Sequence, residues 1–218
     1  MSADQKGGHD HPHPFQPDIE DQPFEYYQIM AEAVGELLIE KQVFSANELR
    51  QTIEDIDARS PADGANLVAR AWLDFEFRTR LLKDANEAAG ELGVDVGMIP
   101  IQVVENTAKV HHVICCTLCS CYPRLLLGLP PDWYKARAFR SRIVREPRKV
   151  LREFGTVIPD DVELRVHDST ADLRYMVLPQ RPAGTDQLSE IELAALVTRD
   201  CMIGTALPRL MHEESSAS

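Results

Sequence analysis

The chain has 218 residues, of which 44% are apolar, and it carries a formal net charge of −12. This length fits one domain, or one domain with an arm, and is enough to bury a substantial core. The acidic balance argues against nucleic acid or an anionic membrane as the main partner, because both need a basic face, although a local basic patch over residues 137–152 is compatible with it. No apolar stretch approaches the roughly 20 residues of a membrane-spanning helix, and no apolar signal region opens the chain, so we expect a cytoplasmic protein.

The first segment, residues 1–23, is polar and rich in Pro, Asp and His. Such a composition buries too little apolar surface to offset the entropy lost on ordering, so we expect a disordered His-rich tail. The alternative is a weak metal-capturing arm, because clustered histidines bind cobalt, nickel and zinc ions.

Residues 24–95 are expected to form a helical N-terminal region. An apolar face repeats at three- and four-residue spacing, a capping box precedes a second helix, and a Ser-Pro pair starts a third. These features are Met30, Ala33, Val34, Leu37 and Leu38 for the face, Ser45-Ala46-Asn47-Glu48 for the box, and Ser60-Pro61 for the start. Gly93 is expected to end a fourth helical run near residues 76–92, and Trp72 and Phe75 are expected to be packing residues.

Residues 96–207 change character and predict a mixed domain, which makes the fold class α+β. Two β-rich runs flank the turn at 105–107, and a basic helical stretch ends at Gly155. The runs 162–166 and 173–178 are separated by a short polar turn, so we expect a hairpin there. A final helix is expected over about 189–199, followed by a flexible tail at 208–218.

Four of the five cysteines fall within seven residues, at 115, 116, 119 and 121, and the fifth is Cys201. An odd number of cysteines without a signal sequence does not resemble a disulfide framework. A Cys-x-x-Cys loop brings two sulfurs to one point, and Cys121 adds a third. With a strongly Lewis-acidic trivalent ion, the amide nitrogens around Ser120 would also coordinate, leaving a sixth position open for catalysis.

The spacing alone leaves the type of metal site open. A structural zinc site needs a fourth ligand, for which His111, His112 or Cys115 is available. An iron–sulfur cluster needs another cysteine and a different spacing, and a thioredoxin-like redox pair leaves Cys121 unexplained.

The string Cys116-Thr117-Leu118-Cys119-Ser120-Cys121-Tyr122-Pro123 resembles the metal-claw signature of nitrile hydratase α subunits. The similarity covers roughly residues 27–207. It includes the stretches 104–107, 127–135, 144–148, 174–179, 181–185 and 198–200. The resemblance implies that the helical N-terminal region is followed by a layered α/β/β/α domain.

The resemblance also implies a metal and a reaction. Cys116 would be an unmodified axial thiolate, Cys119 a sulfinic acid and Cys121 a sulfenic acid, with backbone nitrogens of Ser120 and Cys121 completing the claw. Thr117 in the loop favours non-corrin cobalt(III), with iron(III) as the alternative. The reaction would be hydration of a nitrile to an amide, with attack by the Cys121 sulfenate oxygen or by a water that it activates. Catalytic roles would fall to Cys119, Ser120 and Cys121.

A partner chain follows from the same resemblance. The oxidised sulfurs need cationic partners, which in the family are arginines of a β subunit, present as one chain or split into two. Within this chain, the only obvious candidate arginine is Arg124. Thr117 and Arg124 are expected to line the pocket for a small-molecule nitrile, although Arg124 would also suit the surface.

Several positions depart from the nitrile hydratase pattern. Arg124 stands where Trp is usual, His112 where Asn is usual and Cys201 where Ser is usual, and all three resemble the metal-bearing subunit of thiocyanate hydrolase. A Gln-Gly-Glu-type loop is replaced near residues 97–100. Thiocyanate hydrolysis is therefore the alternative activity, and a metal-carrying assembly subunit without turnover is the non-enzymatic one. Cys115 is expected to be a core thiol, and His111 and His112 are expected to be structural.

Overall fold

The computed structural model describes residues 26–119 and 121–210. Ser120, the predicted tail 1–23 and most of the predicted tail 208–218 lie outside the described residues. The first helices are α1 (Tyr26–Glu40), α2 (Ala46–Asp57), α3 (Ala62–Leu73), α4 (Phe75–Lys83) and α5 (Ala85–Glu91). They are followed by β1 (Ile101–Glu105), β2 (Val110–Cys115), α6 (Arg124–Leu127), α7 (Asp132–Lys135), α8 (Arg137–Ile143), α9 (Pro147–Glu153), β3 (Glu163–Asp168), β4 (Arg174–Leu178), α10 (Glu190–Ala195) and α11 (Arg199–Ile203).

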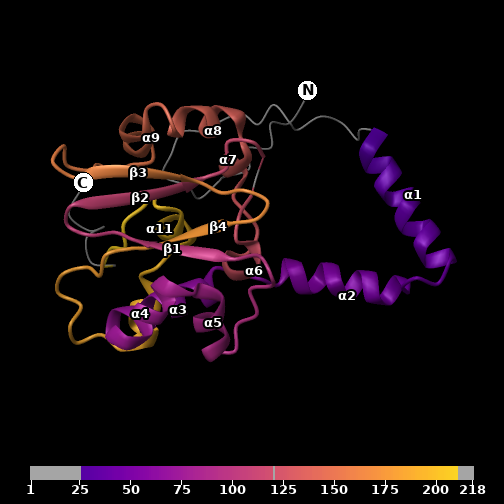
Figure 1. Cartoon of the computed structure of the whole chain (residues 1–218), viewed down its shortest axis with the longest axis horizontal. Helices are drawn as coiled ribbons and strands as arrows, with labels where there is room; N and C mark the ends of the chain where they lie inside the picture. The colour runs from indigo at the N-terminus through magenta and orange to yellow at the C-terminus, as the bar shows by residue number, and fades with distance from the viewer. Residues whose placement is uncertain (1–25, 120, 211–218) are drawn as a thin grey trace, which may run out of the picture.

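Helices α1 and α2 form an arm that extends away from the body of the molecule (Figure 1). The predicted capping box starts α2: the Glu48 amide donates to Ser45 Oγ at 3.2 Å, and the Ser45 amide donates to Glu48 Oε2 at 2.7 Å. The predicted apolar face of α1 is helical, yet neither helix of the arm contains a buried residue. The apolar side chains of the arm therefore have no core to pack into within the described chain.

The strands form two separate two-stranded sheets, and the expected hairpin is wrong. β3 pairs in parallel with β2, with Val166 opposite Val113, whereas β4 pairs in parallel with β1, with Met176 opposite Val103. The turn after β3 therefore carries the chain from one sheet to the other. The alternation of apolar residues in the sequence indicates which face of a strand is buried, but it does not indicate which other strand pairs with that strand.

The two sheets form the middle of a layered α/β/β/α arrangement, as expected (Figure 1). Helices α8 and α9 lie over the sheet of β2 and β3, and α3, α4 and α5 lie against the sheet of β1 and β4. All residues of β2 after the first are buried, which is typical of parallel strands covered on both faces. The core between the layers includes Val113, Ile114, Met176 and Val177.

Two predicted helices differ from the structure. The run 76–92 divides at Asp84, whose side chain accepts from the Glu87 amide and so starts α5. The final helix, expected over about 189–199, ends at Ala195, and a separate helix that was not predicted, α11, begins after its cap Thr198. Trp72 packs against the core and donates from Nε1 to the Pro179 carbonyl at 2.8 Å. Phe75 is 74% exposed, so its predicted packing role is wrong.

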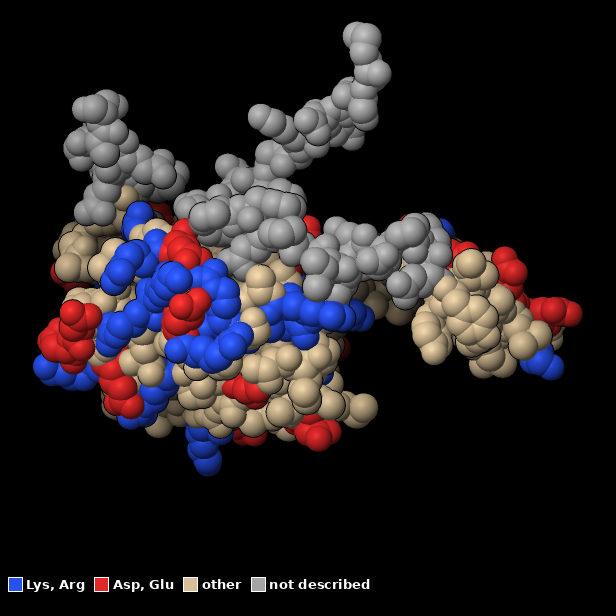
Figure 2. Space-filling view, turned by 90° about the horizontal axis from the view of Figure 1, so that it is seen from above, with Lys and Arg blue, Asp and Glu red and all other residues tan. Residues whose placement is uncertain are grey.

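Lys and Arg side chains gather over α8 and α9, on the face that Figure 2 shows. Part of this basic patch is neutralised within the chain, because Arg142 pairs with both Glu146 and Glu153 at 2.6 Å. In the part of the chain that the structure describes, no helix has the length and apolar character needed to cross a membrane.

Candidate metal centre

Three thiols converge on the loop that follows β2. The sulfur of Cys119 lies 3.6 Å from that of Cys116 and 3.3 Å from that of Cys121, and all three lie within 4.8 Å of one another. Cys116 is buried, Cys121 is partly buried and Cys119 is exposed. Among the described residues this is the only group of three or more His, Cys, Asp or Glu side chains arranged to hold a metal ion.

The loop is held in place by side chains from later elements. Asp168, the last residue of β3, accepts from the Thr117 amide at 2.8 Å and from Thr117 Oγ1 at 2.5 Å. Tyr134 on α7 donates its hydroxyl to the Cys121 carbonyl at 3.0 Å, and Arg140 on α8 donates to the Thr117 carbonyl at 3.5 Å. Sequence reasoning missed Asp168, Tyr134 and Arg140, because only the pairing of β3 beside β2 brings the first of them opposite Cys115.

The three thiols are difficult to ionise together unless a cation is present. Burial, and then the contacts with Cys119 and Cys116, raise the pKa of the Cys121 thiol to about 12, while Arg174 opposes this rise. Thiolates held this close repel one another, so the three can ionise together when a cation shares them. The donor set present is therefore one that a metal ion would complete.

Cys115 is a core thiol, as predicted. It is the last residue of β2 and is fully buried, next to Cys116 in sequence. Burial, followed by the charges of Asp168 and Cys116, raises the pKa of the Cys115 thiol to about 12. A protonated, enclosed thiol is unreactive, which separates Cys115 from the three clustered cysteines.

Both histidines of β2 are structural, as predicted. His111 Nε2 lies 2.8 Å from the Gly204 carbonyl, and its Nδ1 lies 3.1 Å from the Asn106 amide. His112 Nδ1 lies 2.7 Å from His167 Nε2, and burial together with the charge of His167 lowers the pKa of His112 to about 4. In the described ranges, neither histidine joins the three thiols, so the four-ligand zinc arrangement gains no support.

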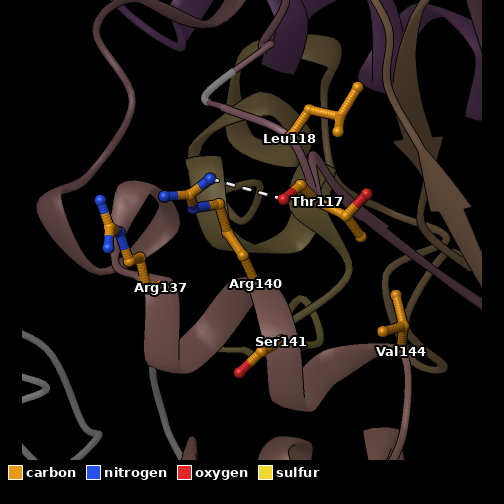
Figure 3. A pocket seen from close by; sticks show the side chains of 6 residues that line it. All are labelled: Thr117, Leu118, Arg137, Arg140, Ser141 and Val144. Atoms are coloured by element: carbon orange, nitrogen blue, oxygen red, sulfur yellow. Dashed lines mark hydrogen bonds between the residues drawn. The ribbon is translucent and has the colours of Figure 1, made fainter.

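The two predicted pocket residues line different cavities. Thr117 and Leu118 border a cavity of about 560 Å³ whose other wall is α8, with Arg137, Arg140 and Ser141 (Figure 3). Leu118, at the tip of the loop, is 86% exposed. Arg124, on α6, borders a second cavity of about 320 Å³ instead. The structure therefore does not bring Thr117 and Arg124 to one pocket.

Arg124 is not the only arginine beside the loop, which corrects the sequence-based expectation. Arg140 is buried and reaches the Thr117 carbonyl, as the dashed line in Figure 3 marks. Arg174, the first residue of β4, lies close enough to Cys121 to favour its thiolate. No sequence signal distinguishes these two from the chain's other arginines, since each becomes relevant only through packing.

The chain is similar to known proteins in both sequence and fold. A family model described as "Nitrile hydratase, alpha chain" matches residues 25–206. The low-molecular weight cobalt-containing nitrile hydratase subunit alpha of Rhodococcus rhodochrous is 50% identical over 179 residues, which are 81% of this chain and 86% of that one. The thiocyanate hydrolase subunit gamma of Thiobacillus thioparus is 43% identical over 195 residues, covering 84% of this chain and 80% of that one. A solved structure of a double mutant of Fe-type nitrile hydratase from Comamonas testosteroni Ni1 superimposes with a TM-score of 0.77 at 39% identity, covering 86% of this chain and 92% of that one.

Proposed function

The chain belongs to the nitrile hydratase alpha-chain family, and from this premise we propose that it is the metal-bearing subunit of an enzyme that adds water to a nitrile to give an amide. The observation that carries the proposal is the cluster of three thiols on a loop anchored from β3, α7 and α8. A cavity of about 560 Å³ opens beside this loop and is large enough for a small substrate.

Cys116, Cys119 and Cys121 would hold the ion, together with the backbone nitrogens of Ser120 and Cys121. We propose non-corrin cobalt(III), because a 50% identical relative is described as cobalt-containing, and keep iron(III) as the alternative because of the Fe-type relative. When bound, the ion would supply Lewis acidity toward the nitrile.

Cys119 would be oxidised to a sulfinic acid and Cys121 to a sulfenic acid. Oxidation of a cysteine follows its exposure and thiolate character, and Cys119 and Cys121 are the more accessible thiols of the three. Buried Cys116 would stay a thiolate. This order of exposure supports the oxidation pattern independently of the sequence motif.

The remaining residues of the loop position these groups. Asp168 fixes Thr117, and Tyr134 fixes the Cys121 carbonyl, so the loop is anchored at Thr117 and at Cys121. The Cys121 sulfenate oxygen would add to the nitrile carbon while the nitrile nitrogen takes up a proton, and a water would then release the amide and restore the sulfenate. Alternatively, this oxygen would take a proton from a water that itself adds to the nitrile carbon. Thr117 would line the path to the loop.

The active form would include an arginine-bearing β subunit, as one chain or two. Oxidised sulfurs are anionic groups that require cationic partners when buried. The arm of α1 and α2 supports a partner chain, because its apolar side chains are unburied here, including Tyr27, Ile29 and Val34. We further propose a cytoplasmic location.

Thiocyanate hydrolysis is the second candidate. Arg124, His112 and Cys201 follow that enzyme's pattern, and the thiocyanate hydrolase gamma subunit is 43% identical. A metal-carrying assembly subunit without turnover is the non-enzymatic candidate.

The test is to express the chain with its β partner, load it with cobalt in air, and assay a nitrile and thiocyanate in parallel. We expect one cobalt per chain, added oxygen masses on the peptide containing Cys119 and Cys121, and amide formation only in the complex. Cys121→Ser should lower the cobalt content, whereas Cys201→Ser, which alters a buried thiol outside the cluster, should not. Bound zinc with unmodified thiols in the active complex, or full turnover by the isolated chain, would refute the proposal.

A further inference from the structure

The second cavity, of about 320 Å³, lies beside the residues that directly follow the metal loop. Its polar side chains include two arginines from distant parts of the chain, Arg124 on α6 and Arg174 at the start of β4. The remaining wall is largely apolar and includes Val96, Met98, Ile99, Ile101 and Leu125. None of the described residues that line this cavity is Asp or Glu, and we call it the Arg124–Arg174 pocket.

Neither arginine of the pocket has a carboxylate partner among the described residues. Other arginines of this acidic chain do: Arg80 pairs with Glu91 at 2.8 Å, and Arg142 pairs with Glu153 at 2.6 Å. Arg174 is the sharper case, because its Nη1 is buried without a hydrogen-bond partner in the described part of the chain. A guanidinium that lines a cavity and has no carboxylate beside it favours a ligand that brings an acceptor.

The backbone of Arg174 is fixed in place beside the pocket. The Arg174 amide donates to the Pro100 carbonyl at 2.9 Å, which anchors the start of β4 beside the segment 97–100. That segment, Gly97-Met98-Ile99-Pro100, offers no charged side chain to the guanidinium. Tyr122 and Pro123 complete the wall, and they follow Cys121 directly. The Arg124–Arg174 pocket therefore lies against the segment that directly follows Cys121, whereas the larger cavity borders Thr117 and Leu118 on the same loop.

We propose that the Arg124–Arg174 pocket binds the carboxylate of an anionic nitrile, so that the substrates of this subunit carry a negative charge at the end opposite the cyano group. This inference rests on the proposed function and names the substrate class for it. A planar guanidinium binds a carboxylate through two parallel hydrogen bonds, and the apolar wall suits the carbon chain between the two groups. Thiocyanate is also an anion with a cyano group, but it has no apolar part for a largely apolar cavity of this volume.

The experiment uses the cobalt-loaded complex with its β partner. The ratio of kcat/KM for 3-cyanopropanoate to kcat/KM for pentanenitrile, a neutral nitrile of the same length, is measured with thiocyanate as a third substrate. We expect Arg174→Gln to lower this ratio roughly ten- to a hundredfold, as loss of a charge-assisted hydrogen bond does. Arg124→Gln should lower it less, because Arg124 is exposed and its charge is screened. Arg165→Gln is the matched control, since that arginine lies on β3, pairs with Glu163 and is outside the pocket.

A second measurement does not depend on turnover. Calorimetric binding of 3-cyanopropanoate to the metal-free complex should exceed that of pentanenitrile and should weaken in Arg174→Gln. If this binding is selective while no nitrile is hydrated, the pocket is supported and the proposed function fails. If Arg174→Gln does not fold, Arg124→Gln and the preference of the unmodified complex decide the question.

Two results would overturn the inference. One is equal binding of the anionic and neutral nitriles with no change in either variant. The other is an effect of both variants on thiocyanate alone, which would assign the pocket to that anion and not to a carboxylate.

Discussion

Asp168 should control how tightly the metal loop is held. Its carboxylate accepts two hydrogen bonds from Thr117, at 2.8 Å from the amide and 2.5 Å from Oγ1. A hydrogen bond to a charged group contributes about 1.5–3 kcal/mol, but Thr117 is partly exposed, so solvent reduces the sum. We expect Asp168→Ala to lower the free energy of unfolding of the metal-free chain by about 1–3 kcal/mol.

The more informative effect of Asp168→Ala is on the metal. Without the Asp168 carboxylate, Thr117 is no longer fixed, and the distances between the three sulfurs should increase. Cobalt retained per chain after dialysis against a chelator should fall, and so should the oxygen added to Cys119 and Cys121. Thr117→Ser keeps both donors and serves as the control, whereas Thr117→Val keeps only the amide and should be intermediate. Equal cobalt retention in all variants would show that Asp168 does not position the loop.

Three further predictions concern other parts of the chain. Arg124→Trp should shift preference toward small apolar nitriles at equal cobalt content, and an unchanged ratio of kcat/KM values across polar, aliphatic and thiocyanate substrates would contradict this. Gly204→Ala should lower the free energy of unfolding, measured by chemical denaturation, by about 2–5 kcal/mol, because φ of Gly204 is +90° and an added Cβ would lie 2.1 Å from the His112 carbonyl oxygen. Gly90→Ala is the control, because a Cβ at Gly90 would meet no atom within 4 Å. Because burial lowers the pKa of His112 to about 4 and also lowers that of His167, the folded state resists their protonation; stability should therefore be complete above pH 6.5 and fall as the pH drops toward 4. Chemical denaturation across this range should show a shallower fall for His112→Phe, and an identical slope would rule out the histidine pair as the cause.

The sequence predicted features that are decided within a few residues. The capping box at Ser45 and the core thiol at Cys115 both depend on near neighbours in the chain. The helix break at Asp84 is also local, but the sequence did not predict it. An aspartate is equally common on the exposed face of a continuous helix, so its role as the N-cap of α5 is visible only in the structure.

Features that depend on distant pairing were not predictable in the same way. The strands around Ser169 were expected to pair with each other, and each instead joins a strand formed much earlier in the chain. The thiol cluster itself was predicted from spacing and resemblance. The residues that hold it, Asp168, Tyr134 and Arg140, were not, because each arrives from an element whose position only the complete fold determines.

The parallel pairing of β3 with β2 has a consequence for protein design. The six residues from Cys116 to Cys121 cannot be transferred by themselves, because the carboxylate that holds Thr117 belongs to β3, which lies beside β2 in a parallel pair. If the same six residues were placed on a simple hairpin, the three thiols would be present, but the hydrogen bonds that hold the loop would be absent. An artificial metalloprotein that borrows this centre would have to import the parallel strand pair with it, and preferably the tyrosine of α7 as well.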